Sequence, residues 1–447
     1  MTNSKEIFTN EIDFSDYDKQ KDLTVMENRY DRYKDSGIAW IGEIPEHWKI
    51  IPHKRIMRKK KIIKEIYAGE NILSLTKKGV IIRDLEAGGK MPTTFNGYQI
   101  LYPNNLLLCL FDIDVTPRCV GIIKNVGLSS PAYSQFVLNK LGHTPFFDYL
   151  LKYMDDEKCL LHLSKNLRNS LTEEDFGQIE TILPPISEQQ AIADYLDRRC
   201  SEIDDLIALQ EEMITKLQSY KQSVITEAVT RGLDKNVPLK DSGIDWIGKV
   251  PEHWETYKLK RCAQFINGFA FNSNKFNKNT GIPVIRIGDI SNEYISFDNI
   301  VYVKEDIELE KVIAKRNDIL IAMSGATVGK IGIYKTEDKA YINQRVGIIR
   351  TIQYNFIKRI FATQGFTDYV NLSSAGSAQP NISSDGILNF YIPAPPLAEQ
   401  QAIADYLDQQ CSEIDELIAL KQQKIEKLKE YKKSLIFECV TGKRKVS

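Results

Sequence analysis

Two blocks of this chain occur twice, almost letter for letter, and this repeat constrains the fold more than any other feature. The block DSGIAWIGEIPEHW at Asp35–Trp48 returns at Asp241–Trp254 with 11 of its 14 positions identical. The block EQQAIADYLDRRCSEIDDLIAL at Glu188–Leu209 returns 211 positions later, at Glu399–Leu420, with three of its 22 positions changed. Because such internal repeats reflect the architecture, we interpret the rest of the chain around them.

The segments between the repeated blocks, residues 49–183 and 255–394, look almost unrelated. The chain therefore alternates variable and constant segments in two near-equal halves. Two copies of a constant element present the same surface twice, as a two-fold partner arrangement requires. Two divergent elements in equivalent positions indicate two different ligands. A duplication whose middle has merely drifted is the alternative, but drift would also have eroded the constant blocks.

Each copy of the second block opens a segment with helical periodicity. Apolar residues recur every three or four positions from Ser187 to about Val229, and again from about Ala398 to Val440. Gly232 follows the first segment, where a helix stop is expected. A lone long helix is marginal in water, so we expect the two helices to pack together as an antiparallel coiled coil. Two unrelated surface helices are the alternative.

The variable segments have a mixed α/β pattern. The stretch NDILIAMSGATVGKIGIY indicates strand, glycine-containing loop and strand, and NNLLLCLFDIDVTPRCVGIIKN takes the equivalent place in the first half. The predicted fold class is α+β, with two mixed α/β domains separated by two long antiparallel coiled-coil helices in an internal pseudo-two-fold repeat.

The predicted boundaries follow from the repeats. They are an N-terminal extension at 1–34, a first mixed domain at 35–185, a central helix at 186–232, a second mixed domain at 233–396 and a C-terminal helix at 397–447. The extension has no counterpart before the second half. The C-terminal TGKRKVS resembles the start of the linker TRGLDKNVPLK, so we expect the two ends of the chain to be close in space.

Composition excludes several classes of protein. No stretch approaches the roughly 20 apolar residues of a membrane span, and the polar N-terminus is unlike a signal peptide. The seven cysteines are scattered and never form a CxxC pair, which favours free thiols in a reducing cytoplasm. The net charge of −1 means that any binding to nucleic acid must come from local patches.

No motif for catalysis is convincing. GATVGK at Gly325–Lys330 has three residues between its glycines, and Ile331 follows the lysine, whereas a phosphate loop needs four residues there and then Ser or Thr. We therefore expect a hairpin loop. His47 and His253 recur within PEHW, where a packed or capping histidine is favoured over a metal ligand. No metal site and no methyl-donor motif is predicted, which disfavours an enzyme acting alone.

The repeats resemble a known family. SGIxWIGxxPEHW opening each half, PPxxEQxAIADYLD before each long helix, SGATVGKIGI and GSAQPNISSDGILNFYIPAPPLAEQ are similar to segments of the specificity subunits of Type I restriction–modification systems. The similarity extends over nearly the whole chain from Asp35 onward. It implies a non-catalytic subunit whose two target recognition domains each read one half of a split double-stranded DNA sequence.

The resemblance also implies partners. The paired helices would hold the target recognition domains at a fixed separation, of the order of one B-DNA turn of about 34 Å between half-sites. They would dock two methyltransferase subunits, which bring S-adenosylmethionine, and two restriction/translocase subunits that use ATP and Mg²⁺ can join. No cofactor is expected on this chain.

Candidate DNA ligands are taken from side chains suited to phosphate contacts or base reading. In the first half they are Lys59, Lys60, Arg118, Lys124, Ser130, Tyr133, Lys165, Asn166 and Arg168. In the second half they are Asn272, Lys275, Ser324, Thr327, Lys330, Asn343, Gln344, Arg345, Gln379 and Asn381. The most basic run, HKRIMRKKKIIK, is equally compatible with a solvated face.

A different class of function remains open. The chain could be a helical scaffold that dimerises a partner protein without reading DNA, which explains the constant repeats but leaves two divergent polar-looped domains without a purpose. The salt dependence of binding to duplex DNA discriminates between these two functions, because a DNA-binding protein loses affinity for DNA steeply as the salt concentration rises.

Overall fold

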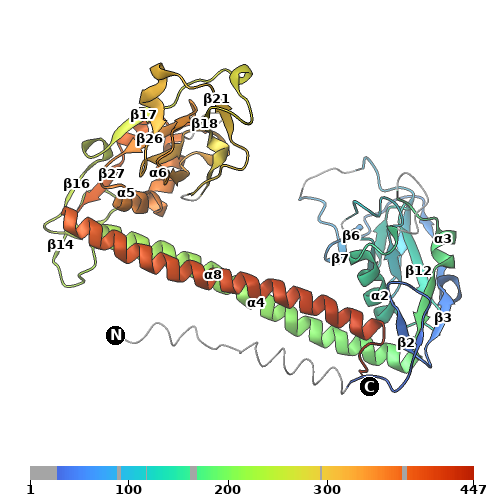
Figure 1. Ribbon diagram of the computed structural model, residues 1–447. Coiled ribbons are helices and arrows are strands. Elements are labelled where there is room, and N and C mark those ends of the chain that lie inside the picture. Colours follow the sequence, from blue (N-terminus) through green and yellow to red (C-terminus); the bar gives the residue numbers. More distant parts are fainter. Residues whose placement is uncertain are drawn as a thin grey trace. The chain divides into compact units, whose positions relative to one another are not determined.

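The computed structural model describes residues 28–87, 92–116, 118–161, 169–291, 294–374 and 380–446. It divides into two compact units (Figure 1). The first unit is Met1–Leu209 with Lys424–Ser447, and the second unit is Gln210–Gln423. Each unit contains one mixed α/β domain and about half of each long helix.

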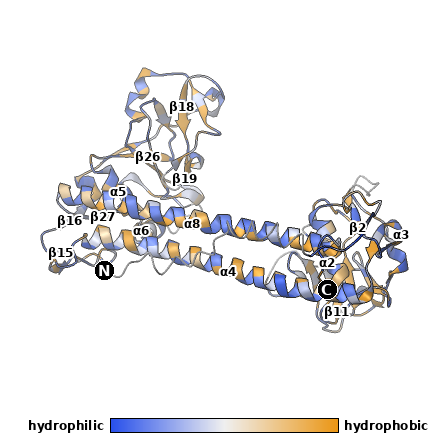
Figure 2. Ribbon diagram, turned by 60° about the horizontal axis from the view of Figure 1, so that its bottom comes forward, coloured by the Kyte–Doolittle hydropathy of each residue, from blue (hydrophilic) through white to orange (hydrophobic). Residues whose placement is uncertain are grey.

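The two long helices begin where the sequence predicts, but the C-terminal helix ends at Val440 and not at the predicted boundary of 447, because Gly442 has a left-handed backbone that stops the helix. Helix α4 spans Ile186–Arg231 and α8 spans Leu397–Val440. Figure 2 shows hydrophobic and hydrophilic residues alternating along both, as an amphipathic periodicity requires. In the first unit, Leu196 and Ile203 of α4 share a core with Leu428 and Leu435 of α8. In the second unit, the shared core residues are Ile225, Val229, Ile403 and Leu407.

The helices are antiparallel within each unit. In the first unit, Cys200 lies near Cys439 while the Lys432 ammonium donates to both carboxylate oxygens of Asp204 at 2.7 Å. Positions therefore rise along α4 as they fall along α8. In the second unit, Lys221 donates to Asp415 at 2.7 Å. The repeat offset of 211 relates Asp204 to Asp415 and Lys221 to Lys432, so the two ion pairs are equivalent.

The first mixed domain is built on two sheets and a hairpin. The main sheet has the order β10-β9-β12-β4, with β4 Met57–Lys59, β9 Leu106–Leu108, β10 Val120–Ile122 and β12 Ser134–Leu138. The second has the order β11-β8-β5, with β5 Ile63–Lys64, β8 Tyr98–Leu101 and β11 Gly127–Ser129, and β6 Leu73–Thr76 pairs with β7 Gly79–Ile82. Helices α2 Thr144–Asp156 and α3 Glu173–Gln178 follow. Phe146, Phe147 and Leu150 of α2 are fully buried in the core.

The second mixed domain repeats this main sheet with different residues. Its order is β17-β26-β23-β24, with β17 Gln264–Asn267, β23 Ile319–Ala322, β24 Ile331–Ile333 and β26 Val346–Arg350. A further sheet has the order β21-β18-β25-β22, with β18 Ile282–Ile285, β21 Val301–Val303, β22 Ile313–Ala314 and β25 Ala340–Ile342. Strands β19 Ile290–Ser291 and β20 Tyr294–Ile295 pair with each other, and the helices are α5 Tyr354–Phe361, α6 Gln364–Ser374 and α7 Ser384–Leu388. The predicted hairpin around GATVGK is confirmed, because β23 and β24 are antiparallel.

Short strand pairs frame each domain in the same way. In the first unit, β1 Tyr33–Asp35 pairs with β2 Glu43–Pro45, and β3 Lys49–Pro52 pairs with β13 Glu180–Leu183. In the second unit, β14 Leu239–Asp241 pairs with β15 Lys249–Pro251, and β16 Glu255–Lys258 pairs with β27 Tyr391–Ala394. The segment after each PEHW thus joins the strand that leads into a long helix.

The repeated PEHW binds the first turn of a long helix. The indole N–H of the fully buried Trp48 donates to Glu188 Oε2 at 3.0 Å, and His47 Nε2 lies 2.6 Å from Glu188 Oε1. In the second unit, Trp254 donates to Glu399 at 2.9 Å and His253 Nε2 lies 2.7 Å from the same carboxylate. A carboxylate in the first turn also faces the positive end of the helix dipole. We call these two arrangements the glutamate clamps.

Each clamp also contacts the end of the other long helix. Gly442 follows α8 with φ 74°, and a Cβ there would lie 2.4 Å from Pro45 and 2.9 Å from the Trp48 ring. Gly232 follows α4 with φ 75°, and its Cβ would lie 3.1 Å from the Trp254 ring. Only glycine combines this left-handed backbone with so close an approach. Each tryptophan therefore lies between the start of one helix and the end of the other.

The two ends of the described chain lie side by side in the first unit. The Tyr33 hydroxyl donates to the Gly442 carbonyl at 3.1 Å, and the backbone N–H of Lys445 donates to the Asn28 carbonyl at 2.7 Å. The expected proximity of the ends is confirmed for this part of the chain. Within the described ranges, no helix is both long and apolar enough to cross a membrane.

One core position differs between the halves in a way that predicts a pH effect. His53 is fully buried, its ring stacks on Phe176 with centroids 4.6 Å apart, and burial lowers its pKa to about 4. The equivalent position, 206 residues later, is the fully buried Leu259.

We expect His53→Leu to weaken the pH dependence of stability. With an unfolded pKa of 6.5 and a folded pKa of about 4, the neutral imidazole contributes its full stability above pH 6.5, and this is lost as the pH falls towards 4. Between pH 7.5 and 4.5 the wild type should lose about 2.5 kcal/mol more free energy of unfolding than the variant. Urea denaturation at both pH values measures this, and equal losses in the two proteins would contradict it.

The clamps predict a second effect on stability. Glu399→Ala should destabilise the second unit by about 1–3 kcal/mol, because the buried Trp254 N–H loses its acceptor. Glu413→Ala is the matched control, since Glu413 is exposed on the same helix and accepts a hydrogen bond from Gln409 at 3.1 Å. Chemical denaturation should show a change below about 0.5 kcal/mol for this control. Equal effects of both substitutions would show that the glutamate clamp contributes nothing to the free energy of unfolding.

Candidate nucleic-acid interface

Three segments converge at one end of the main sheet of the second unit. They are the hairpin loop 323–330, the turn 343–345 between β25 and β26, and the segment 380–382. The Met323 N–H donates to the Arg345 carbonyl at 2.9 Å, and the Ile382 N–H donates to the Met323 carbonyl at 2.9 Å. The Gly325 N–H donates to the Pro380 carbonyl at 2.9 Å. We call these three segments the second-domain loop face.

A fourth segment, residues 268–275, contacts this face through its first two residues. The Phe269 N–H donates to the Ile342 carbonyl at 3.0 Å, and Phe269 pairs with Asn343 in an isolated bridge. A Cβ on Gly268 would lie 2.1 Å from the Asn343 carbonyl oxygen, so glycine is required for this approach. The predicted ligands Asn272 and Lys275 are exposed on this segment.

The structure thus brings together seven of the ten second-half candidates. They are Ser324, Thr327, Lys330, Asn343, Gln344, Arg345 and Asn381, whereas Asn272 and Lys275 lie further along the segment 268–275 and Gln379 lies outside the described residues. Their exposure differs. Lys330, Gln344 and Asn381 are exposed, but Ser324 is buried and accepts from the Arg345 guanidinium at 3.2 Å. Ser324 therefore positions the arginine side chain.

The first unit has an equivalent arrangement, the first-domain loop face. It consists of the β9–β10 loop, described at 109–116 and 118–119, the turn 130–133 and the segment 169–171. The Leu171 N–H donates to the Leu110 carbonyl at 2.8 Å, and the Ile113 N–H donates to the Asn169 carbonyl at 3.2 Å. The Phe111 and Tyr133 rings stack with centroids 5.8 Å apart.

A buried amide holds the turn of this face. The Gln99 side chain is fully buried and donates to the Ser130 carbonyl at 2.9 Å and to the Tyr133 carbonyl at 2.7 Å. The Tyr133 side chain is half-buried, and burial raises the pKa of its hydroxyl. The predicted ligands Ser130 and Tyr133 therefore belong to a rigid turn, as a recognition surface requires.

The remaining first-half candidates are dispersed. The Arg118 side chain is 17% exposed and its guanidinium pairs with Asp156 at 2.8 Å, so it holds the β9–β10 loop to the end of α2. Lys124 is exposed but follows β10, at the end opposite to that loop. Lys59 forms an ion pair with Glu173, and the Lys60 ammonium lies 3.6 Å from the centroid of the Tyr102 ring. Lys165, Asn166 and Arg168 lie outside the described residues. DNA contact by these side chains stays a prediction.

The attachment of each domain to a long helix uses a residue that we did not predict from the sequence. In the first unit, the Tyr149 hydroxyl of α2 donates to Asp197 Oδ1 at 2.7 Å. In the second unit, the equivalent Asp408 pairs with Arg359 and with Lys358 of α5. Burial raises the pKa of Asp408, but these partners lower it further, below its usual value. The sequence feature that could have predicted these contacts is the aspartate that ends IADYLD in both copies.

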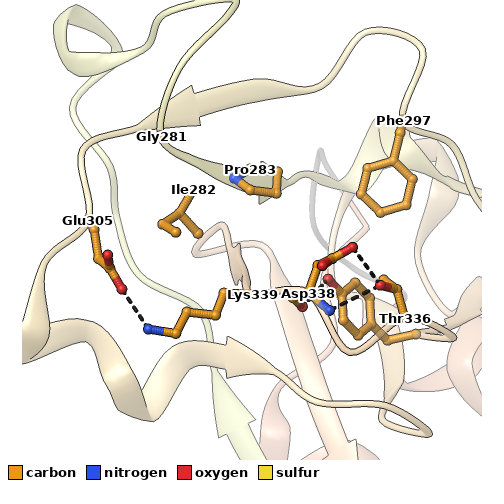
Figure 3. Close-up of a pocket in the computed structure, with 9 residues that line it drawn as sticks. Gly281, Ile282, Pro283, Phe297, Glu305, Thr336, Asp338 and Lys339 are labelled. Carbon is orange, nitrogen blue, oxygen red and sulfur yellow. Dashed lines mark hydrogen bonds and ion pairs between the residues drawn. The ribbon is translucent and has the colours of Figure 1, made fainter.

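A cavity in the second unit lies apart from these segments (Figure 3). It measures about 690 Å³ and is lined by Gly281, Ile282, Pro283, Phe297, Glu305, Tyr334, Thr336, Asp338 and Lys339. Lys339 and Glu305 form an ion pair at 2.6 Å, and the Tyr334 hydroxyl donates to the Asp338 carbonyl at 2.7 Å. The loop 334–339 follows β24, whereas the hairpin loop of the second-domain loop face precedes it. The polar groups that line the cavity bind one another, and the cavity is separate from the second-domain loop face.

Comparison with protein families and curated proteins adds independent findings. Residues 251–430 match the family model described as the Type I restriction modification DNA specificity domain. The chain is 31% identical over 281 residues to the Type I restriction enzyme MjaVIII specificity subunit of Methanocaldococcus jannaschii. That alignment covers 61% of this chain and 63% of the relative, which is just under two thirds of its length.

Solved structures are similar over most of the chain. A chain from a study of complex assembly and conformational transition of the type I R-M system has a TM-score of 0.69 at 13% identity, covering 89% of this chain and 98% of that chain. The HsdS subunit from Thermoanaerobacter tengcongensis has a TM-score of 0.53 at 16% identity, covering 90% and 98%. At these identities the likeness shows the fold. The family model and the curated relative add that the chain is similar in sequence to Type I restriction enzyme specificity subunits.

Proposed function

We propose that this chain is a non-catalytic subunit that recognises a bipartite double-stranded DNA target, one half-site for each loop face. The observation that supports this most directly is that two divergent loop faces are built on the same sheet order and attached to the long helices by equivalent residues. Equivalent construction with different surface residues suits two readers of unlike sequences.

The side chains on the loop faces divide into two roles. Gln344, Arg345 and Asn381 are of the types that form bidentate hydrogen bonds with base edges in the major groove. Lys330, and Lys275 on the neighbouring segment 268–275, suit phosphate contacts, which set the position of the protein on the duplex. On the first-domain loop face, Ser130 and Tyr133 take corresponding places.

The long helices are the proposed docking elements for partner subunits. Leu209 and Leu420 are related by the repeat offset and are 45% and 60% exposed, and the equivalent pair Ile186 and Leu397 is also exposed. Apolar side chains presented twice suit two copies of one partner. We propose two methyltransferase subunits that carry S-adenosylmethionine, with two restriction/translocase subunits that use ATP and Mg²⁺ joining them.

Genome-wide mapping of methylated bases, in a host that expresses this chain with its methyltransferase partner, tests the proposal. A bipartite motif with an invariant gap is the expected result. Lys330→Ala or Asn381→Ala should relax one half-site only, because both residues belong to one loop face. Lys335→Ala is the matched control, since Lys335 is exposed in the same unit but follows β24. Relaxation of both half-sites by Asn381→Ala would refute the division between the domains.

The length of the long helices should set the gap. Seven residues inserted after Leu209 and another seven after Leu420 would lengthen α4 and α8 by about 10 Å while keeping the heptad spacing. At 3.4 Å per base pair, the gap in the methylated motif should grow by about three base pairs. If both half-sites were still recognised with an unchanged gap, the length of the helices would not be what sets the gap.

A further inference from the structure

The most basic run of the chain lies along the outer strand of the first domain. Strand β4 pairs with β12, with Lys59 opposite Phe136 and Arg58 opposite Val137, and forms one edge of the sheet β10-β9-β12-β4. Side chains alternate between the two faces of a strand. The run is therefore divided between two surfaces with different electrostatic surroundings.

One of these surfaces is neutralised. Met57 is buried in the core, and Lys59 on the same face forms an ion pair with Glu173, which also accepts from the Ser134 hydroxyl at 2.6 Å. Burial raises the pKa of Glu173, but the contacts with Lys59 and Ser134 and the charge of Lys61 outweigh it and lower the pKa. Lys59 and Lys61, the cations on this face, thus share the Glu173 carboxylate.

The opposite surface keeps its charge. Arg58 is exposed and Lys60 is partly exposed, and no carboxylate among the described residues is found in an ion pair with either. The Lys60 ammonium lies over the Tyr102 ring at 3.6 Å from its centroid, a cation–π contact that orients the ammonium without neutralising it. The buried Gln135 accepts from the Tyr102 N–H at 2.8 Å and donates to the Lys60 carbonyl at 3.4 Å, which fixes this contact.

These cations lie beside the first-domain loop face. The Lys60 N–H donates to the Gln135 carbonyl at 2.8 Å, and Gln135 is two residues from Tyr133 in the turn of that face. Arg58 is two residues further along the same strand, about 7 Å away. A ligand seated on the loop face is therefore within reach of both side chains.

The second domain lacks this feature. The repeat offset of 206 relates Arg58 and Lys60 to Gln264 and Ile266 of β17, which is the corresponding outer strand of the sheet β17-β26-β23-β24. The sequence of β17 is QFIN, without a charged residue. The two domains thus differ in charge at an equivalent edge, although their sheets share the same order.

We propose that Arg58 and Lys60 form a phosphate-binding edge on the first domain, for which the second domain has no equivalent. The ligand is the anionic backbone of duplex DNA, so this inference rests on the proposed function. The edge contributes affinity without sequence preference and releases counterions on binding. Each phosphate contact contributes about 0.9 to the slope of log affinity against log salt.

Binding of the full chain to a random-sequence DNA duplex tests this edge. Fluorescence anisotropy between 50 and 200 mM salt, for the wild type and for Arg58→Gln/Lys60→Gln, gives the two slopes. We expect the slope to fall by up to about 1.8 in the double variant, and by about 0.9 in Arg58→Gln alone. Arg58→Lys/Lys60→Arg, which keeps both charges, should retain the wild-type slope.

The matched control removes the same charge elsewhere. Lys311 and Lys335 are exposed in the second unit, and Lys311→Gln/Lys335→Gln should leave the slope unchanged. An unchanged slope in Arg58→Gln/Lys60→Gln, or an equal fall in the control, would overturn the phosphate-binding edge while leaving DNA recognition intact. Absence of salt-dependent binding by the wild type would overturn the proposed function itself. Unfolding midpoints equal to the wild type confirm that the variants are folded.

Discussion

The shared carboxylate in each glutamate clamp is the interaction on which the rest of the structure depends. Glu188 and Glu399 each receive a buried indole N–H and a histidine while occupying the first turn of a long helix. The same tryptophan packs on the glycine that ends the other long helix. One clamp therefore joins a domain, the start of one helix and the end of the other. A buried donor that loses its acceptor is costly, which gives a physical reason for the near-identity of the two repeated blocks.

The two clamps are not fully equivalent. In the first unit, the Tyr30 hydroxyl adds a third donor to Glu188 at 2.8 Å. Burial and this hydrogen bond raise the pKa of Tyr30, whereas the donors to Glu188 outweigh the effect of burial and lower the pKa of the carboxyl group. The segment before the first repeated block therefore contributes to the clamp. The second clamp receives no corresponding tyrosine among the described residues.

In each half, an aspartate of the repeated helix block contacts residues of the variable domain. Asp197 and Asp408 are invariant between the halves, but Tyr149 binds the first and Arg359 with Lys358 binds the second. The helix side of the contact is preserved and the domain side differs. The same division appears in the sheets, whose order is shared although the residues at the loop faces and outer strands differ. The shared framework of helices and sheets can therefore carry different surface residues in each domain while the domains are attached in the same way.

The sequence alone determined the repeat, the two long helices and the hairpin around GATVGK. Both helices begin within one residue of the predicted positions and α4 ends within two, because a period of three to four and the flanking stop signals are local properties of the chain. The C-terminal helix, predicted over 397–447, ends at Val440. The seven second-half candidates that the structure brings together were also predictable as polar residues in loops.

Only the tertiary structure decided which charged side chains are available. Lys59 and Lys60 are neighbours in the sequence, yet Glu173 neutralises the first and Tyr102 orients the second. Arg118 is held by Asp156, and Lys124 lies at the far end of its strand. Strand alternation and partners more than 30 residues away decide these outcomes, and neither is encoded in the local pattern of a basic run.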